Sequence, residues 1–155
     1  MENCVGARNR QIGWVCAALG AFTGLIMGLW SFDGPVTVPG WLGEYGATSR
    51  RLARLGHIAF FGLGILNLLL ARELTLSALG QRGKRVASVA MNFGNIFLPL
   101  TLFGAAAYAP LKYLMSVPAS AVFMALVLAA YGASTRIPPT DPATNRSGKF
   151  GEAGT

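Results

Sequence analysis

Four long apolar stretches without a single Asp, Glu, Lys or Arg constrain the fold of this chain more than any other feature. They cover residues 12–32, 55–71, 86–109 and 118–135. A helix needs about 20 apolar residues, at ~1.5 Å each, to cross a hydrocarbon core of about 30 Å. Inside that core, a helix satisfies its own backbone hydrogen bonds. The sequence therefore predicts an all-α polytopic membrane protein with four transmembrane helices in an antiparallel up-down bundle.

The composition supports a membrane protein and argues against a soluble one. Hydrophobic residues make up 53% of the chain and charged residues only 12%, about half the usual charged share. The net charge of +7 comes from basic residues at the edges of the apolar stretches. Basic residues in that position set topology and contact phospholipid headgroups. Membrane lipid is therefore the predicted partner, and binding to nucleic acid is not expected.

The domain organisation follows from the same stretches. We expect a cytoplasmic N-terminal leader over residues 1–11, a transmembrane domain over residues 12–135 and a disordered cytoplasmic tail over residues 136–155. An outer loop over residues 33–49, rich in Gly and Pro, joins the first two spans. The first stretch is too long for a cleaved signal peptide and is followed by no small-x-small cleavage site, so it is interpreted as a retained span.

The distribution of Lys and Arg predicts the orientation. Nine of the 13 basic residues flank the spans on one side, and such an excess marks the cytoplasmic side. These nine are Arg8, Arg10, Arg72, Arg82, Lys84, Arg85, Arg136, Arg146 and Lys149. The sequence thus predicts a multi-pass protein of the cell (inner) membrane with both termini in the cytoplasm. Three arginines crowded at the outer start of the second span, Arg50, Arg51 and Arg54, oppose this trend.

Two spans carry stripes of small residues at every fourth position, which let a neighbouring helix approach closely. The stripe of the first span is glycine and that of the fourth is alanine. Their members are Gly20, Gly24, Gly28 and Ala121, Ala125, Ala129, Ala133. Both stripes predict contact with a helix of this chain, with another membrane subunit or with a second copy, and the spacing leaves these alternatives open.

Polar residues inside the spans are the candidate site, because an unbonded polar group in hydrocarbon costs free energy. His57 and Asn67 share one face of the second helix, while Asn92 and Asn95 share one face of the third. Depth along the helices predicts that the three asparagines meet, with His57 some 15 Å further out. Pro99, which lacks an N–H, frees the backbone carbonyl of Asn95.

This polar site has two interpretations. In the first, the asparagines clip the second and third helices together. In the second, the asparagines and His57 form a small pocket for a solute, a quinone headgroup or a haem. His57 is the only histidine of the chain, and haem held between membrane helices usually needs a second axial ligand. The sequence leaves the cofactor undefined and predicts no metal site.

The chain contains no phosphate-binding loop, zinc-binding helix motif or Ser/His/Asp set, so we do not expect an enzyme. The leading hypothesis is an accessory or structural subunit of a larger membrane complex, packed through the glycine and alanine stripes. The alternative is a small-molecule or cofactor binder that uses His57, Asn67, Asn92 and Asn95. The outer loop, which carries Trp41, is expected either to fold back on the membrane or to cover a ligand site. A transporter or enzyme site there ranks last, because no charged group is expected to point to it.

Overall fold

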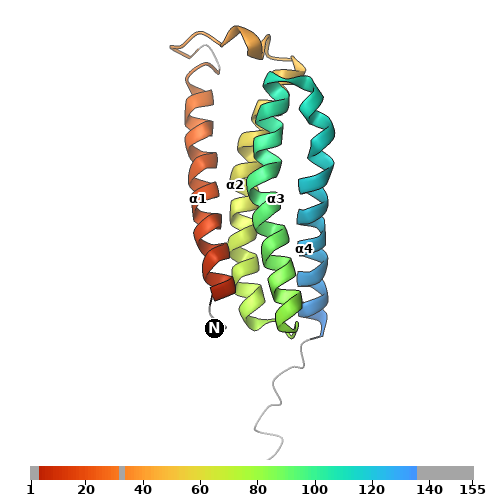
Figure 1. Ribbon diagram of the computed structural model, residues 1–155. Helices are drawn as coiled ribbons and strands as arrows, with labels where there is room; N and C mark the ends of the chain where they lie inside the picture. Colours follow the sequence, from red (N-terminus) through yellow and green to blue (C-terminus); the bar gives the residue numbers. More distant parts are fainter. Residues whose placement is uncertain (1–3, 32–33, 136–155) are drawn as a thin grey trace, which may run out of the picture.

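The computed structural model describes residues 4–31 and 34–135, and it contains four long helices that run alternately up and down (Figure 1). The helices are α1 (Cys4–Gly28), α2 (Thr48–Leu76), α3 (Gln81–Ala107) and α4 (Ser116–Ser134). All four are long and apolar enough to cross a membrane, α4 together with the 3-10 helix η2 (Ala109–Met115) before it. The predicted all-α, four-span fold is confirmed. The predicted tail, residues 136–155, lies outside the described residues.

Two helices extend well beyond their apolar stretches. α1 begins at Cys4 rather than near residue 12, and α2 runs over 29 residues, Thr48–Leu76, rather than over 55–71. At ~1.5 Å per residue, α2 is about 43 Å long, which exceeds the ~30 Å hydrocarbon core. Its charged ends therefore reach the headgroup layers, where the long side chains of arginine meet water and phosphate.

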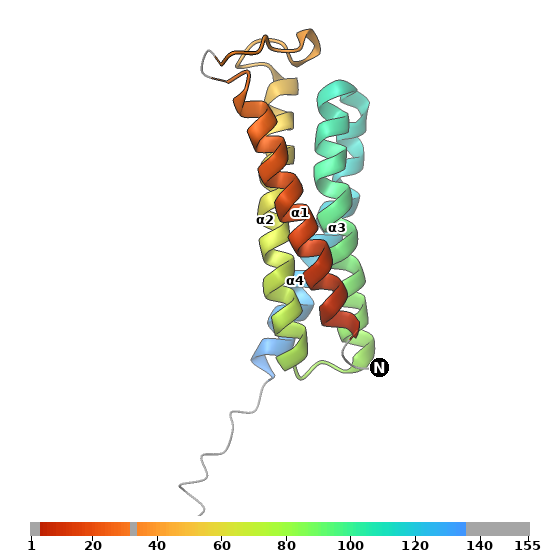
Figure 2. The same cartoon turned by 90° about the vertical axis from the view of Figure 1, so that its left-hand side faces the viewer.

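α2 and α3 form the centre of the bundle. α1 packs mainly against α2, and α4 packs mainly against α3 (Figures 1 and 2). The start of α1 and the end of α4 lie at one end of the bundle, which we call the terminal end (Figure 1). The opposite end, where residues 34–47 cross from α1 to α2, is called the loop end. Because α1 and α4 lie on different sides of the central pair, much of their apolar surface faces outward, as lipid contact requires.

The glycine stripe of α1 is used within the chain. A Cβ added to Gly20 would lie 2.5 Å from the backbone nitrogen of Phe61 in α2, so only glycine allows this approach. At Gly24, an added Cβ would lie 3.2 Å from the ring of His57. Gly28, in contrast, has no neighbour within 4 Å of that position. The contact partner that the sequence left open is therefore α2 for two of the three glycines.

The alanine stripe of α4 is also used mostly within the chain. Ala125 is fully buried, and Ala121 and Ala129 pack against the same core cluster, whereas Ala133 is exposed. The buried members of this cluster come from α2, α3 and α4: Leu70, Leu74, Ala87, Ala90, Met91, Val122 and Ala125. Contact with a second chain stays a prediction for the free ends of the two stripes, Gly28 and Ala133.

Candidate functional site

Four polar side chains from three helices form one hydrogen-bonded network towards the terminal end, which we call the polar cluster. The side-chain nitrogen Nδ2 of Asn9 donates to Oδ1 of Asn67 at 2.6 Å. In turn, Nδ2 of Asn67 donates to Oδ1 of Asn92 at 2.8 Å. The hydroxyl of Ser88 donates to Oδ1 of Asn9, which Nδ2 of Asn92 also approaches at 3.5 Å. The polar cluster thus links α1, α2 and α3.

The polar cluster is satisfied by its own members. Asn67, whose side chain is fully buried, uses both its oxygen and its nitrogen on protein partners. Asn67 and Asn92 meet, as the sequence predicts. Hydrogen bonds of this kind between membrane helices stabilise the bundle by roughly 1 kcal/mol each. The geometry therefore favours the interpretation in which the asparagines hold helices together over one in which they bind a ligand.

Asn9 is a member of the cluster that sequence reasoning missed. It lies between Arg8 and Arg10, and these charges placed it in a polar leader. The signal that would have found it is helical spacing, because Asn9 precedes Gly13 by four residues and Gly20 by eleven. On one continuous helix these residues share the face that packs against α2.

Asn95 does not join the other asparagines, so the prediction that all three form one cluster is wrong. Its side chain is fully buried, and neither its Oδ1 nor its Nδ2 has a hydrogen-bond partner among the described residues. Three residues along a helix rotate a side chain by about 60° and raise it by about 4.5 Å relative to Asn92. Its backbone carbonyl, which Pro99 frees, lies 3.9 Å from Sγ of Cys16 in α1, and the thiol donates to it.

His57 also lies apart from the polar cluster. Its ring is half-buried against Gly24 of α1, and its Nδ1 is buried without a hydrogen-bond partner among residues 4–31 and 34–135. Ten residues of helix, about 15 Å, separate it from Asn67. Across the described part of the chain, no group of three or more His, Cys, Asp or Glu side chains is placed to hold a metal ion. The residues predicted as one site thus occupy three separate places.

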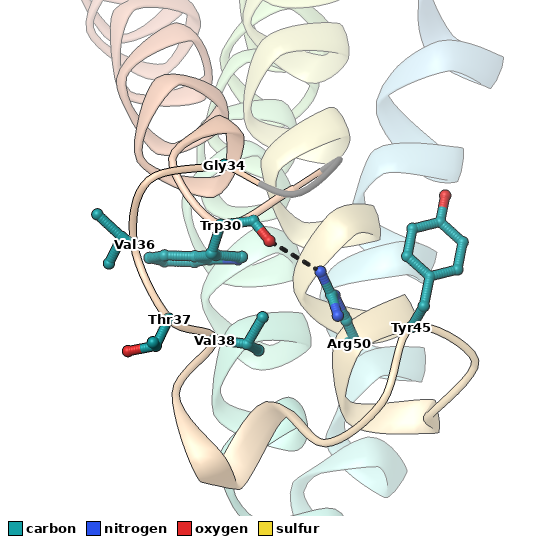
Figure 3. A pocket seen from close by; sticks show the side chains of 7 residues that line it. All are labelled: Trp30, Gly34, Val36, Thr37, Val38, Tyr45 and Arg50. Atoms are coloured by element: carbon teal, nitrogen blue, oxygen red, sulfur yellow. Dashed lines mark hydrogen bonds between the residues drawn. The ribbon is translucent and has the colours of Figure 1, made fainter.

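A pocket at the loop end combines apolar walls with a buried charge (Figure 3). Its volume is about 480 Å³. Residues from the end of α1, the connecting loop and the first turn of α2 form its walls: Trp30, Gly34, Val36, Thr37, Val38, Tyr45 and Arg50. Arg50 meets the backbone oxygen of Trp30, the indole ring of Trp30 extends towards Val36, and Val36, Thr37 and Val38 line the loop side (Figure 3). We call this hollow the loop-end pocket.

Arg50 is the most unusual residue of this pocket. The side chain is only 8% exposed, yet no carboxylate among the described residues pairs with it. One N–H donates to the backbone oxygen of Trp30 at 3.2 Å, and the guanidinium carbon lies 5.3 Å from the ring centre of Tyr45. A buried charge that lacks a partner costs several kcal/mol. The described residues leave Arg50 without a counter-charge, while Asp33 of the same loop lies outside them. A guanidinium has five N–H donors, so Arg50 has donors to offer an anion.

Trp30 adds a second donor at the same pocket. The indole Nε1 is buried, and no acceptor among the described residues is within hydrogen-bonding distance. Buried polar groups in proteins nearly always have a partner, either in the protein or in ordered water. Both Arg50 and Trp30 line the loop-end pocket, and the indole N–H of Trp30 is buried without an acceptor among the described residues.

The connecting loop is held firmly over the end of the bundle. Leu42, in the 3-10 turn η1 (Gly40–Leu42), is 1% exposed and packs in a core cluster with Met27, Ala53 and Ala106. The hydroxyl of Ser49 donates to the backbone oxygen of Leu42 at 2.8 Å. The loop thus folds over the end of the bundle and forms a wall of the loop-end pocket. That it also lies on the membrane stays a prediction.

The expectation that no charged group points to the outer loop is wrong, because Arg50 does. The reason is the early start of α2 at Thr48. Arg50 precedes His57 by seven residues and Gly64 by fourteen, so on a continuous helix it falls on their inward face. A helix start at Thr48 or Ser49 is predictable from their capping side chains, but the apolar span at residues 55–71 does not include Arg50.

Two other hollows lack a buried charge. A groove of about 340 Å³ between α1, α2 and α3 is lined mostly by apolar residues, among them Cys16, Phe60 and Ile96. At the terminal end, Arg10 and Arg72 line a hollow of about 440 Å³, but both arginines are exposed. The loop-end pocket is therefore the best candidate site in the described residues.

Comparisons with known proteins add no family to this picture. The chain matches no protein-family model, and searches of curated proteins and of solved structures found no match. The function is therefore inferred from the geometry of the site alone.

Proposed function

We propose that this chain is a non-catalytic membrane protein that binds a small anionic amphiphile in the loop-end pocket. The observation that carries the proposal is the guanidinium of Arg50, which is buried in a pocket and pairs with no carboxylate of the described residues. An anion in that pocket supplies a counter-charge that the described residues lack and accepts hydrogen bonds from the guanidinium of Arg50. Charge-assisted hydrogen bonds of this type are about twice as strong as neutral ones.

The size and walls of the pocket support an amphiphile rather than a simple ion. Small-molecule sites usually measure about 300–1,000 Å³ and are mostly apolar with a few polar groups. The loop-end pocket, at about 480 Å³, falls in this range. Val36, Val38 and the indole of Trp30 provide apolar surface, while Arg50 fixes the charged group.

The predicted role as an accessory subunit has less support. That prediction rests on the two stripes of small residues. However, Gly20, Gly24 and Ala125 of these stripes contact helices of the same chain. The binder hypothesis, in contrast, gains a site, although at Arg50 and Trp30 rather than at the asparagines. No described contact requires a second subunit.

We also propose that the protein lies in the cell membrane with both termini in the cytoplasm, which puts the loop-end pocket on the outer side. The support is the excess of Lys and Arg at the terminal end. A fluorescent protein fused to the C-terminus, of a kind that folds only in the cytoplasm, is expected to fluoresce, and alkaline phosphatase fused there to be inactive. An active phosphatase fusion without fluorescence would contradict the orientation.

Replacing Arg50 with glutamine is expected to weaken ligand binding at least about tenfold. The protein, purified in a non-ionic detergent, is incubated with oleate and dioleoylphosphatidylglycerol as carboxylate and phosphate probes, and native mass spectrometry counts the bound molecules. We expect a one-to-one adduct for the wild type. The Arg50→Gln variant should bind at least about tenfold more weakly, because it loses charge-assisted hydrogen bonds.

Arg51→Gln is the matched control. It removes the same charge from the next residue along the chain, whose side chain is exposed. It should bind like the wild type. Thermal unfolding of both variants checks that the bundle is intact. Equal adduct formation by Arg50→Gln and the wild type, or no one-to-one adduct at all, would exclude the proposed function.

A further inference from the structure

We infer that the ligand of the loop-end pocket is an anionic phospholipid of the adjacent leaflet, whose phosphate is held by Arg50. This inference rests on the proposed function and specifies its ligand. It follows from three features of the pocket: its depth relative to the bilayer, the geometry of its donors and the charge around its rim.

The pocket lies where lipid headgroups are found. Its walls come from residues just after the end of α1 at Gly28 and from Arg50 in the first turn of α2. Because α2 is about 43 Å long, its ends extend past the ~30 Å hydrocarbon core into the headgroup layer. Trp30 and Tyr45 line the same pocket, and aromatic residues of these types concentrate at the membrane interface. A lipid therefore reaches this pocket without leaving its leaflet.

The free donors suit a phosphate group. A guanidinium presents parallel N–H groups in a planar fork that matches two oxygens of one phosphate or carboxylate. One N–H of Arg50 is used by the backbone oxygen of Trp30, and the guanidinium makes no other hydrogen bond to a described residue. Its remaining N–H groups can therefore form such a fork on a phosphate.

The rim of the pocket carries a second positive charge. The guanidinium carbon of Arg54 lies 4.3 Å from the ring centre of Tyr45, and one of its N–H groups donates to the backbone oxygen of Tyr45 at 3.0 Å. Tyr45 thus contacts two arginines, because the guanidinium carbon of Arg50 lies 5.3 Å from the centre of the same ring. Two positive charges at one pocket favour a headgroup with net negative charge over a zwitterionic one.

The same lipid accounts for an irregularity of the sequence. Arginines at the outer start of the second span oppose the orientation that the other basic residues set. Arg50 and Arg54 are two of these: Arg50 lines the loop-end pocket, and Arg54 lies against Tyr45, which also lines it. A bound anionic lipid gives these arginines a counter-charge and therefore a reason to lie on the outer side. A topology signal alone gives no such reason.

The test titrates three probes separately against the protein in a non-ionic detergent, with native mass spectrometry as the readout. The probes are dioleoylphosphatidylglycerol, oleate and inorganic phosphate. The proteins are the wild type, Arg50→Lys, Arg50→Gln and Arg51→Gln. We expect phosphatidylglycerol to bind one-to-one and at least about tenfold more tightly than either other probe. Arg50→Lys should bind it severalfold more weakly and Arg50→Gln at least about tenfold more weakly, because lysine keeps the charge but lacks the fork.

The other outcomes separate the inference from the proposed function. If oleate binds most tightly, and does so through Arg50, the phospholipid is the wrong ligand but the pocket still binds an anionic amphiphile. If inorganic phosphate binds through Arg50 and phosphatidylglycerol does not compete with it, the lipid source is excluded and the ligand is a soluble phosphate. If no probe depends on Arg50, both the inference and the proposed function fail.

Discussion

Replacing Gly20 with alanine is expected to push α1 away from α2 and to lower the free energy of unfolding by about 3 kcal/mol. An added Cβ would lie 2.5 Å from the backbone nitrogen of Phe61 and 2.8 Å from its Cα. These are backbone atoms of a helix, so no side-chain rotation relieves the clash and the helices have to separate. Unfolding in a titration from mild detergent into dodecyl sulfate, followed by circular dichroism, measures the change.

Gly28→Ala is the matched control for this prediction. Gly28 belongs to the same stripe and the same helix, but an added Cβ there meets nothing within 4 Å. Its stability should change by no more than about 0.5 kcal/mol, the range of a surface substitution. If the two variants unfold alike, the close contact between α1 and α2 is not present in the protein.

Replacing Asn67 with leucine is expected to cost about 2 kcal/mol. The substitution keeps the volume of the side chain roughly constant but removes the centre of the polar cluster. The amide nitrogen of Asn9 then loses its acceptor, and Oδ1 of Asn92 loses its donor. A buried polar group left without a partner costs about 1–3 kcal/mol. The same unfolding titration measures this loss.

Asn95→Leu is the control for the Asn67 prediction. Asn95 is as deeply buried as Asn67, but its side chain has no partner among the described residues. Its replacement removes no hydrogen bond of the described chain, so we expect a change near zero or a small gain in stability. A loss as large as that of Asn67→Leu would show that Asn95 holds something in the folded protein that these contacts do not include.

The number and the order of the helices are predictable from the sequence because lipid imposes a simple rule. An uncharged stretch long enough to cross the hydrocarbon core finds no water there for its backbone groups. It satisfies their hydrogen bonds within itself by forming a helix. The meeting of Asn67 and Asn92 is also predictable, since the short link between α2 and α3 fixes their depth. Both follow from rise per residue and from spacing on a helix face.

The residues that sequence reasoning missed lie where this rule stops. Charge marks the end of an apolar stretch, but the helix itself continues into the headgroup layer. Asn9 and Arg50 lie in such extensions of α1 and α2, and each points inward. The spacing of the glycine and alanine stripes shows that some helix approaches closely, but which helix does so depends on three-dimensional packing.

A density map of the full-length purified protein, obtained by electron microscopy with a bound antibody fragment, tests the central claim most directly. The account predicts non-protein density in the loop-end pocket, within hydrogen-bonding distance of the guanidinium of Arg50. A well-resolved pocket without such density, or a guanidinium paired with a carboxylate of this chain, would contradict it.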